Sequence, residues 1–234
     1  MQENYHKWYS HAIGKDFEML VFGHAGTPVV LFPTSKGKYY ENKDRGMIDA
    51  ASWFIENGLV RIYCPDSIDE YSWYNKGVHP GTRAYNHALY DRLIDEEVLG
   101  RAFYETGHNH AVMAGASFGG YHAVNFGFRH PDRVRAILSM SGAFDIKDQV
   151  DGHYDDNVYF NNPVDFIPNA SDDNIWNMKI ILGCADNDSC LPHNIRLSEI
   201  LDRKGIPHWL DIRPNTTHDW PVWLQMFPHY LSLI

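Results

Sequence analysis

Ser117 is the residue whose surroundings point most directly to chemistry. It lies in Gly115-Ala116-Ser117-Phe118-Gly119, which has the Gly-x-Ser-x-Gly spacing of a nucleophile elbow. Four apolar residues, 111–114, precede the motif and predict a buried strand, and apolar residues at helical spacing follow it. Such a strand-to-helix turn is strained, and it holds the serine hydroxyl clear of the sheet. The motif therefore predicts a nucleophilic serine.

A serine hydroxyl becomes a useful nucleophile when an imidazole removes its proton and an acid fixes the tautomer of that imidazole. Of the 14 histidines, His218 is the one expected in a loop between the last strand and the last helix. Its position downstream of Ser117 also fits the order serine, acid, histidine that accompanies this elbow. We therefore predict that His218 is the general base.

Three carboxylates could serve as the acid of this triad. Asp186 is favoured because it stands closest to the end of the strand predicted over 178–184. Asp188 follows two positions later, and Asp145 comes after the preceding strand. Asp219 is adjacent to the histidine and is expected to cap the last helix instead. The prediction is thus Asp186, with Asp188 and Asp145 left open.

An acyl-transfer site also needs two backbone donors for the oxyanion. One is expected to be the amide of Phe118, which follows the nucleophile. The other should come from the loop over residues 33–37, with Thr34 as the first choice and Ser35 as the second. No metal or organic cofactor is implied. His108 and His110 could form a ligand pair, but no third ligand stands at a suitable spacing.

Strands and helices must alternate if the elbow is to be positioned in this way. Short apolar strands alternating with helices predict an α/β fold with a mostly parallel sheet covered on both faces. Residues 145–174 are rich in Asp, Asn and Pro and are expected to pass over the active site as an excursion within a single domain, 1–234. The predicted strands are 6–13, 17–22, 27–32, 59–64, 111–114, 134–140, 178–184 and 208–212, and the predicted helices are 47–56, 82–101, 118–130, 191–203 and 219–231.

Composition narrows the class of protein. The 234 residues are 44% hydrophobic, which suits one globular domain, and the formal net charge of −10 argues against nucleic acid or an anionic membrane as a partner. The first residues lack the pattern of a signal peptide, and the three cysteines form no even disulfide framework. We expect a cytoplasmic protein that acts on a small-molecule ester and could form a homo-oligomer.

Taken together, these segments resemble the putative-esterase family of α/β-hydrolases. That family includes S-formylglutathione hydrolases of the esterase D type, feruloyl esterases and mycolyltransferases. The resemblance covers about residues 29–223 and is carried by five segments. They are the loop 67–74 ending in Ser-Trp-Tyr, Glu96-Glu97, the elbow 115–120, Gly183-Cys184-Ala185-Asp186, and His218-Asp219-Trp220-Pro221-Val222-Trp223.

The resemblance implies a serine carboxylic-ester hydrolase that works through an acyl-enzyme. Ser117, Asp186 and His218 would then be nucleophile, acid and base, while Trp73 and Trp220, together with Phe118, would line the acyl or alcohol pocket. A thioesterase such as an S-formylglutathione hydrolase, or an acyltransferase, would use the same triad. A silent ligand-binding protein with the same fold is the alternative from another class.

Overall fold

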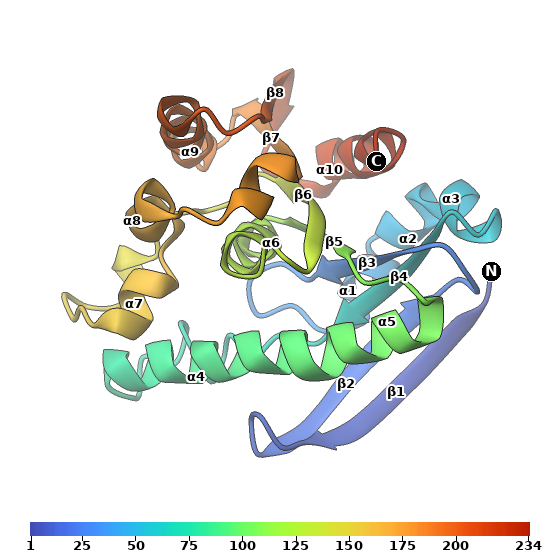
Figure 1. The fold of residues 1–234 in the computed structure, drawn as a ribbon, viewed down its shortest axis with the longest axis horizontal. Helices are drawn as coiled ribbons and strands as arrows, with labels where there is room; N and C mark the ends of the chain where they lie inside the picture. Colours follow the sequence, from blue (N-terminus) through green and yellow to red (C-terminus); the bar gives the residue numbers. More distant parts are fainter.

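The computed structural model describes all residues, 1–234, and has one eight-stranded sheet at its centre (Figure 1). The strand order is β1-β2-β4-β3-β5-β6-β7-β8. β1 and β2 pair antiparallel, β2 pairs antiparallel with β4, and every other neighbouring pair is parallel. The strands are β1 (Glu3–Ser10), β2 (Lys15–Phe22), β3 (Thr27–Phe32), β4 (Val60–Pro65), β5 (Ala111–Ala116), β6 (Val134–Met140), β7 (Lys179–Asn187) and β8 (Trp209–Thr217).

Helices cover both faces of this sheet, which confirms the predicted α/β architecture (Figure 1). One face packs against α4 (Pro80–Leu93), the π-helix η1 (Ile94–Leu99), α5 (Gly100–Thr106), α6 (Phe118–Arg129) and α9 (Leu191–Lys204). The other packs against α2 (Met47–Ala50), α3 (Ser52–Glu56) and α10 (Trp220–Leu231), with α1 (Glu41–Asp44) beside α2. The helix predicted over 47–56 is thus two short helices, because the chain leaves helical geometry at Ala51.

Alternation along the central strands explains why two separate cores form. In β3, Val30 and Phe32 belong to the core under α4 and α6, whereas Val29 and Leu31 belong to the core under α10. Successive side chains of a strand point to opposite faces, so an apolar run fills both cores at once. All six residues of β5, the strand that ends at the elbow, are buried.

The last two strands run further than the sequence predicts. β7 continues three residues past Cys184, and β8 continues five residues past Ile212, up to Thr217. The two extensions pair with each other around a bulge between Ala185 and Asn187. β8 is the edge strand of the sheet and contains no buried residue. This extension decides where the aspartates after β7 lie.

Residues 145–174 form short helical turns, including α7 (Asp156–Phe160) and α8 (Pro163–Phe166). These two helices pack against α4, α6 and α9, at one side of the molecule (Figure 1). Ile146, Val150 and Val158 join a small core with Phe118 at the start of α6. The segment therefore supports the elbow helix from the side.

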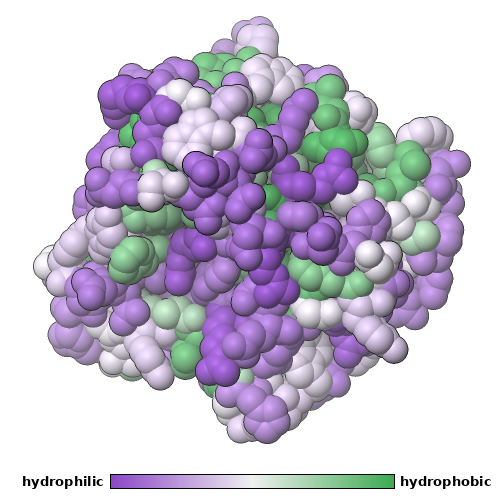
Figure 2. Space-filling model, in the orientation of Figure 1, coloured by the Kyte–Doolittle hydropathy of each residue, from purple (hydrophilic) through white to green (hydrophobic).

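The surface is predominantly polar on the face drawn in Figure 2, where apolar residues occur in small separate groups. The chain contains no helix that combines the length and the apolar character needed to span a bilayer.

Candidate active site

Ser117 sits at the turn between β5 and α6 in a strained conformation, with φ +55° and ψ −122°. Two close approaches explain the flanking glycines. A Cβ at Gly115 would lie 2.4 Å from the backbone of Gly119, and a Cβ at Gly119 would lie 2.6 Å from the carbonyl oxygen of Pro33. Because glycine has no side chain, β5, α6 and the loop after β3 can pack closely against one another at this turn.

His218 lies in the short connection between β8 and α10 and faces this serine. Its Nε2 is 2.9 Å from the Ser117 Oγ, and its Nδ1 is 2.8 Å from the Oδ1 of Asp188. With the ring proton on Nδ1, His218 donates to Asp188 and accepts the hydroxyl proton of Ser117. The imidazole is therefore placed to take the hydroxyl proton, while the carboxylate holds its ring.

Asp186, the favoured acid of the sequence analysis, does not contact His218. The carboxylate of Asp186 accepts hydrogen bonds from the amides of Asn215 and Thr216, at 2.9 and 3.1 Å. The reason is the longer β7: Asp186 lies at its bulge and faces the edge strand, so that Asp188 is the first carboxylate beyond the strand. The structure thus corrects the prediction, since Asp188 is the aspartate beside the imidazole.

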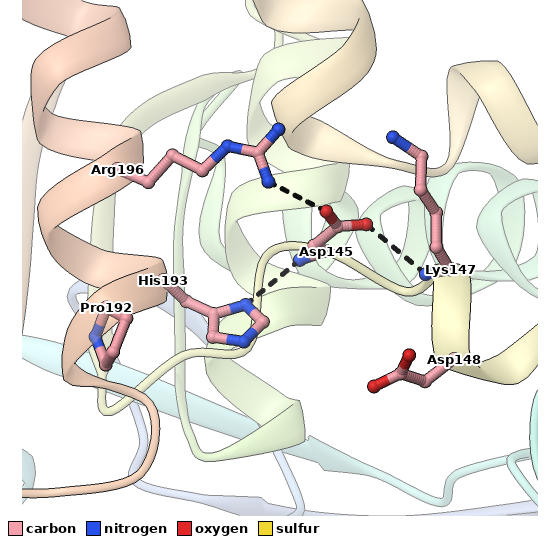
Figure 3. Close-up of a pocket in the computed structure, with 6 residues that line it drawn as sticks. All are labelled: Asp145, Lys147, Asp148, Pro192, His193 and Arg196. Atoms are coloured by element: carbon pink, nitrogen blue, oxygen red, sulfur yellow. Dashed lines mark hydrogen bonds and ion pairs between the residues drawn. The ribbon is translucent and has the colours of Figure 1, made fainter.

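Asp145 is also held elsewhere, in a charged pocket of about 290 Å³ (Figure 3). Its carboxylate accepts from Arg196 at 2.8 Å and from the amide of Lys147 at 3.3 Å, and its own amide donates to His193 at 3.3 Å. Figure 3 shows Arg196 and His193 reaching it from α9. These bonds tie the start of the 145–174 segment to α9.

Electrostatics bind the histidine and the aspartate together. The hydrogen bond with Asp188 is the main cause that raises the pKa of His218 to about 9. Burial alone would raise the pKa of Asp188, but its bonds, that from His218 foremost, outweigh burial and hold this pKa below its ordinary value. An ion pair that favours both charged forms stabilises the imidazolium that forms when His218 takes a proton.

Trp223 holds the histidine ring from the side, a contact that the sequence analysis did not identify. The rings of His218 and Trp223 meet edge to face, with centroids 4.9 Å apart. The indole N–H of Trp223 donates to the hydroxyl of Ser141 at 2.9 Å. Ser141 itself lies just after β6 with φ +55°. The only signal in the sequence was the His-x-Trp-x-x-Trp spacing, which places Trp223 one turn into α10.

Among the amides of residues 33–37 in the loop after β3, one donates to no protein group. Thr34, the first choice for the second oxyanion donor, donates its amide to Glu41 at 2.8 Å and its hydroxyl to the same carboxylate at 2.9 Å. The amides of Ser35 and Phe118 donate to no protein group. The structure therefore moves the choice from Thr34 to Ser35, which lines the same hollow as Ser117.

Asp69 ties this loop to the elbow helix, and sequence reasoning missed it. One of its oxygens accepts from the amide of Lys36 at 2.8 Å, and the other is 3.1 Å from the Nε2 of His122 in α6. Both Asp69 and His122 are buried. Lys36 has φ +57°, so this bond compensates for a strained turn. His122 therefore has a structural role in this link.

Beside the serine is a hollow of about 250 Å³. Trp220 lines it, as the resemblance implied, together with Trp223. Trp73 does not: it is fully buried, its indole N–H donates to the hydroxyl of Tyr121 at 3.1 Å, and it belongs to the core beneath the elbow. The side chain of Phe118 lies in that same core. The residues that line the hollow are Thr34, Ser35, Ser117, His218, Asp219, Trp220 and Trp223.

Solved structures with the same fold are numerous, and three of them illustrate the range. A ferulic acid esterase is 20% identical, with a TM-score of 0.80 over 99% of this chain and 97% of that one. An S-formylglutathione hydrolase from Agrobacterium tumefaciens is 13% identical, with a TM-score of 0.78 over 99% and 93%. MPT51 (FbpC1) from Mycobacterium tuberculosis is 16% identical, with a TM-score of 0.74 over 99% and 97%.

These likenesses confirm the α/β-hydrolase fold. No curated protein matches the chain in sequence. The family described as "Putative esterase" does match, over residues 32–233, and this range includes the elbow, β7, β8 and His218. The chain therefore belongs to the putative-esterase family, and is a carboxylesterase-type hydrolase.

Proposed function

We propose that the protein is a serine carboxylic-ester hydrolase that works through an acyl-enzyme, with Ser117, His218 and Asp188 as its triad. One observation carries this proposal. The Oγ of Ser117, both ring nitrogens of His218 and the Oδ1 of Asp188 form an unbroken line, with steps of 2.9 and 2.8 Å, at the rim of a hollow. Hydroxyl, imidazole and carboxylate in this order are the groups that acyl transfer requires.

In the first half of the reaction, Ser117 attacks the ester carbonyl while His218 takes the hydroxyl proton at Nε2. Asp188 holds the ring in the tautomer that leaves Nε2 free to accept. The developing oxyanion would be held by the amides of Phe118 and Ser35, since these two donate to no other group. His218 then returns the proton to the alkoxide as the alcohol leaves.

In the second half, water attacks the acyl-enzyme. His218 removes a proton from that water and returns it to the Oγ of Ser117 as the carboxylic acid departs. The deacylating water can approach because the hollow is open to solvent and the imidazole is partly exposed. The acid product and the free serine complete the cycle with atoms and charge in balance.

The size of the hollow favours short or medium acyl groups. Its 250 Å³ falls below the roughly 300–1,000 Å³ typical of sites for drug-sized ligands. Trp220 and Trp223 give it one apolar wall, while Thr34 and Ser35 give it a polar one. We infer that a small acyl chain packs against the indole rings.

Hydrolysis of p-nitrophenyl acetate, butyrate and octanoate by the wild type and by Ser117→Ala tests the proposal. We expect turnover of the shorter esters, loss of that turnover in the variant, and covalent labelling of Ser117 by a fluorophosphonate. Peptide mass spectrometry would locate the label. Unchanged turnover in Ser117→Ala, or a label at another residue, would show that the elbow serine is not the nucleophile.

A further inference from the structure

The loop between β4 and α4 places one aromatic side chain against both residues whose amides are proposed to hold the oxyanion. The hydroxyl oxygens of Tyr74 and Ser35 are 2.9 Å apart and share a hydrogen bond. The ring of Tyr74 meets the ring of Phe118 edge to face, with centroids 5.3 Å apart. Tyr74 therefore bridges the loop after β3 and the first residue of α6.

The backbone of Tyr74 is anchored to a residue that also holds the loop after β3. The amide of Tyr74 donates to the carbonyl oxygen of Asp69 at 3.0 Å, and the carboxylate of Asp69 accepts from the amide of Lys36 at 2.8 Å. Ser35 is thus held through its side chain, while its amide donates to no protein group. A free donor on a fixed residue is preorganised, as stabilisation of an oxyanion requires.

The placement of Tyr74 fits an indirect role better than contact with the substrate. Tyr74 is not among the residues that line the hollow beside Ser117, whereas Ser35 is. Its side chain is partly buried, and burial is the main cause that raises the pKa of Tyr74 above its ordinary value. The phenol therefore keeps its proton near neutral pH and remains an uncharged partner for the hydroxyl of Ser35.

We propose that Tyr74 is a positioning residue that fixes the two oxyanion donors, the amides of Ser35 and Phe118, relative to each other. This inference rests on the proposed function. The hydroxyl of Tyr74 holds one donor residue and its ring holds the other, so the separation of the donors is set before the ester binds. Because the oxyanion forms only after attack, loss of this bridge should lower kcat and leave KM nearly unchanged.

A double-mutant cycle on the contact between Tyr74 and Ser35 tests this role. Tyr74→Phe removes one hydroxyl and keeps the ring, while Ser35→Ala removes the other hydroxyl and keeps the amide. Each should lower kcat for p-nitrophenyl butyrate by about 2- to 10-fold, as expected for one hydrogen bond. The double variant should lose no more than the more impaired single variant, since both changes break the same bond. Tyr71→Phe, which alters an exposed tyrosine of the same loop, is the matched control and should keep the wild-type kcat.

Two further readouts separate positioning from a purely structural contact. A trifluoromethyl ketone forms an oxyanion adduct with a nucleophilic serine, so its affinity should fall in Tyr74→Phe by about the same factor as kcat. Tyr74→Leu loses the ring as well as the hydroxyl, and its kcat should lie below that of Tyr74→Phe. Coupling between Tyr74 and Ser35 in urea unfolding without coupling in kcat would overturn the proposal. Losses of kcat that multiply in the double variant would overturn it as well.

These outcomes differ from those that would refute the proposed function. A wild type that neither hydrolyses the ester nor reacts with a fluorophosphonate at Ser117 would refute the esterase mechanism, and the role of Tyr74 with it. A wild type that does both, combined with multiplying losses in the cycle, would refute the role of Tyr74 alone.

Discussion

Two aspartates, two positions apart in the chain, have different partners around one histidine. Asp188 is buried and accepts from the ring of His218, whereas Asp186 accepts from the backbone of Asn215 and Thr216, in the strand that leads to that histidine. Asn215 has φ +57°, and Asp186 stabilises this turn. In the proposed mechanism Asp188 acts on the imidazole, and Asp186 positions the strand that carries it.

Replacing each aspartate by asparagine should distinguish these roles. Asp188→Asn should lower kcat on the order of 10⁴-fold, because an amide can stabilise the wrong tautomer and cannot stabilise the imidazolium. Asp186→Asn should lower kcat by less than about 10-fold, since Asp188 keeps its hydrogen bond to the ring of His218. Kinetics with p-nitrophenyl butyrate measure both. A larger loss in Asp186→Asn than in Asp188→Asn would contradict this assignment.

The pH dependence of the reaction should reflect the same pair. His218 must be neutral to accept a proton, and its bond to Asp188 raises its pKa to about 9. The rate should therefore rise with pH, with a limb above the ordinary value of 6.5. Asp188→Asn removes the negative charge, so in this variant the limb should shift toward lower pH. A pH profile of kcat/KM for both proteins measures this shift, and an identical limb in both would exclude the coupling.

Among the elements, the loop after β3 depends on helix α1. Glu41 holds both the amide and the hydroxyl of Thr34. Asp69 holds Lys36 from the opposite side. The free amide of Ser35 lies between these two anchors. The loop is thus fixed before any substrate binds, as an oxyanion site requires.

Glu41→Ala should loosen this loop and lower kcat on the order of 10- to 100-fold, somewhat less than the loss of one whole oxyanion donor. KM should change little, because the interaction strengthens only in the transition state. Asp44→Asn, in the same helix, is a matched control, since Asp44 is exposed. Kinetics of the three proteins on one ester measure the effect. Equal kcat in all three would show that Glu41 does not organise the donor.

The close packing at the elbow can be tested by comparing Gly119 with Gly100, a helical glycine that lies elsewhere. Gly119→Ala puts a Cβ 2.6 Å from the carbonyl oxygen of Pro33, so it should lower the free energy of unfolding by about 1–3 kcal/mol and displace the elbow. Gly100→Ala, with nothing within 4 Å of the new Cβ, should raise it by about 0.5–1 kcal/mol. Urea unfolding and fluorophosphonate labelling measure both. A fully labelled and equally stable Gly119→Ala would contradict the packing argument.

The sequence predicted local features well and pairings between distant segments less well. Strands 27–32 and 134–140 have the predicted bounds, because apolar runs and turn residues are local signals. The predicted end of β7 is wrong, because Ala-Asp-Asn-Asp is typical of a turn. Only pairing with β8 keeps this segment extended. For the same reason the sequence favours Asp186 over Asp188. No local signal shows that the amide of Thr34 donates to Glu41.

On the scale of the whole molecule, the candidate site draws on both ends of the chain. The loop after β3 is supplied near residue 34, the elbow at 117 and the histidine at 218, and the parallel strands bring all three to their carboxyl ends. The two cores lie on opposite faces, and helices α6 and α10, which follow the serine and the histidine, belong to different cores. The site is therefore assembled only when both cores have formed.

The exposed edge strand then sets the thermal behaviour. Ser117 follows β5, which is wholly buried, whereas His218 follows β8, which has no buried residue and a neighbour on one side only. Local opening is easiest where backbone hydrogen bonds face solvent. On heating, β8 should detach first, so that activity is lost several degrees below the transition seen by near-UV circular dichroism. Superimposed curves would mean that β8 melts with the core. We therefore expect Ser117 to keep its place after His218 has left it, and a briefly warmed enzyme to recover its activity on cooling.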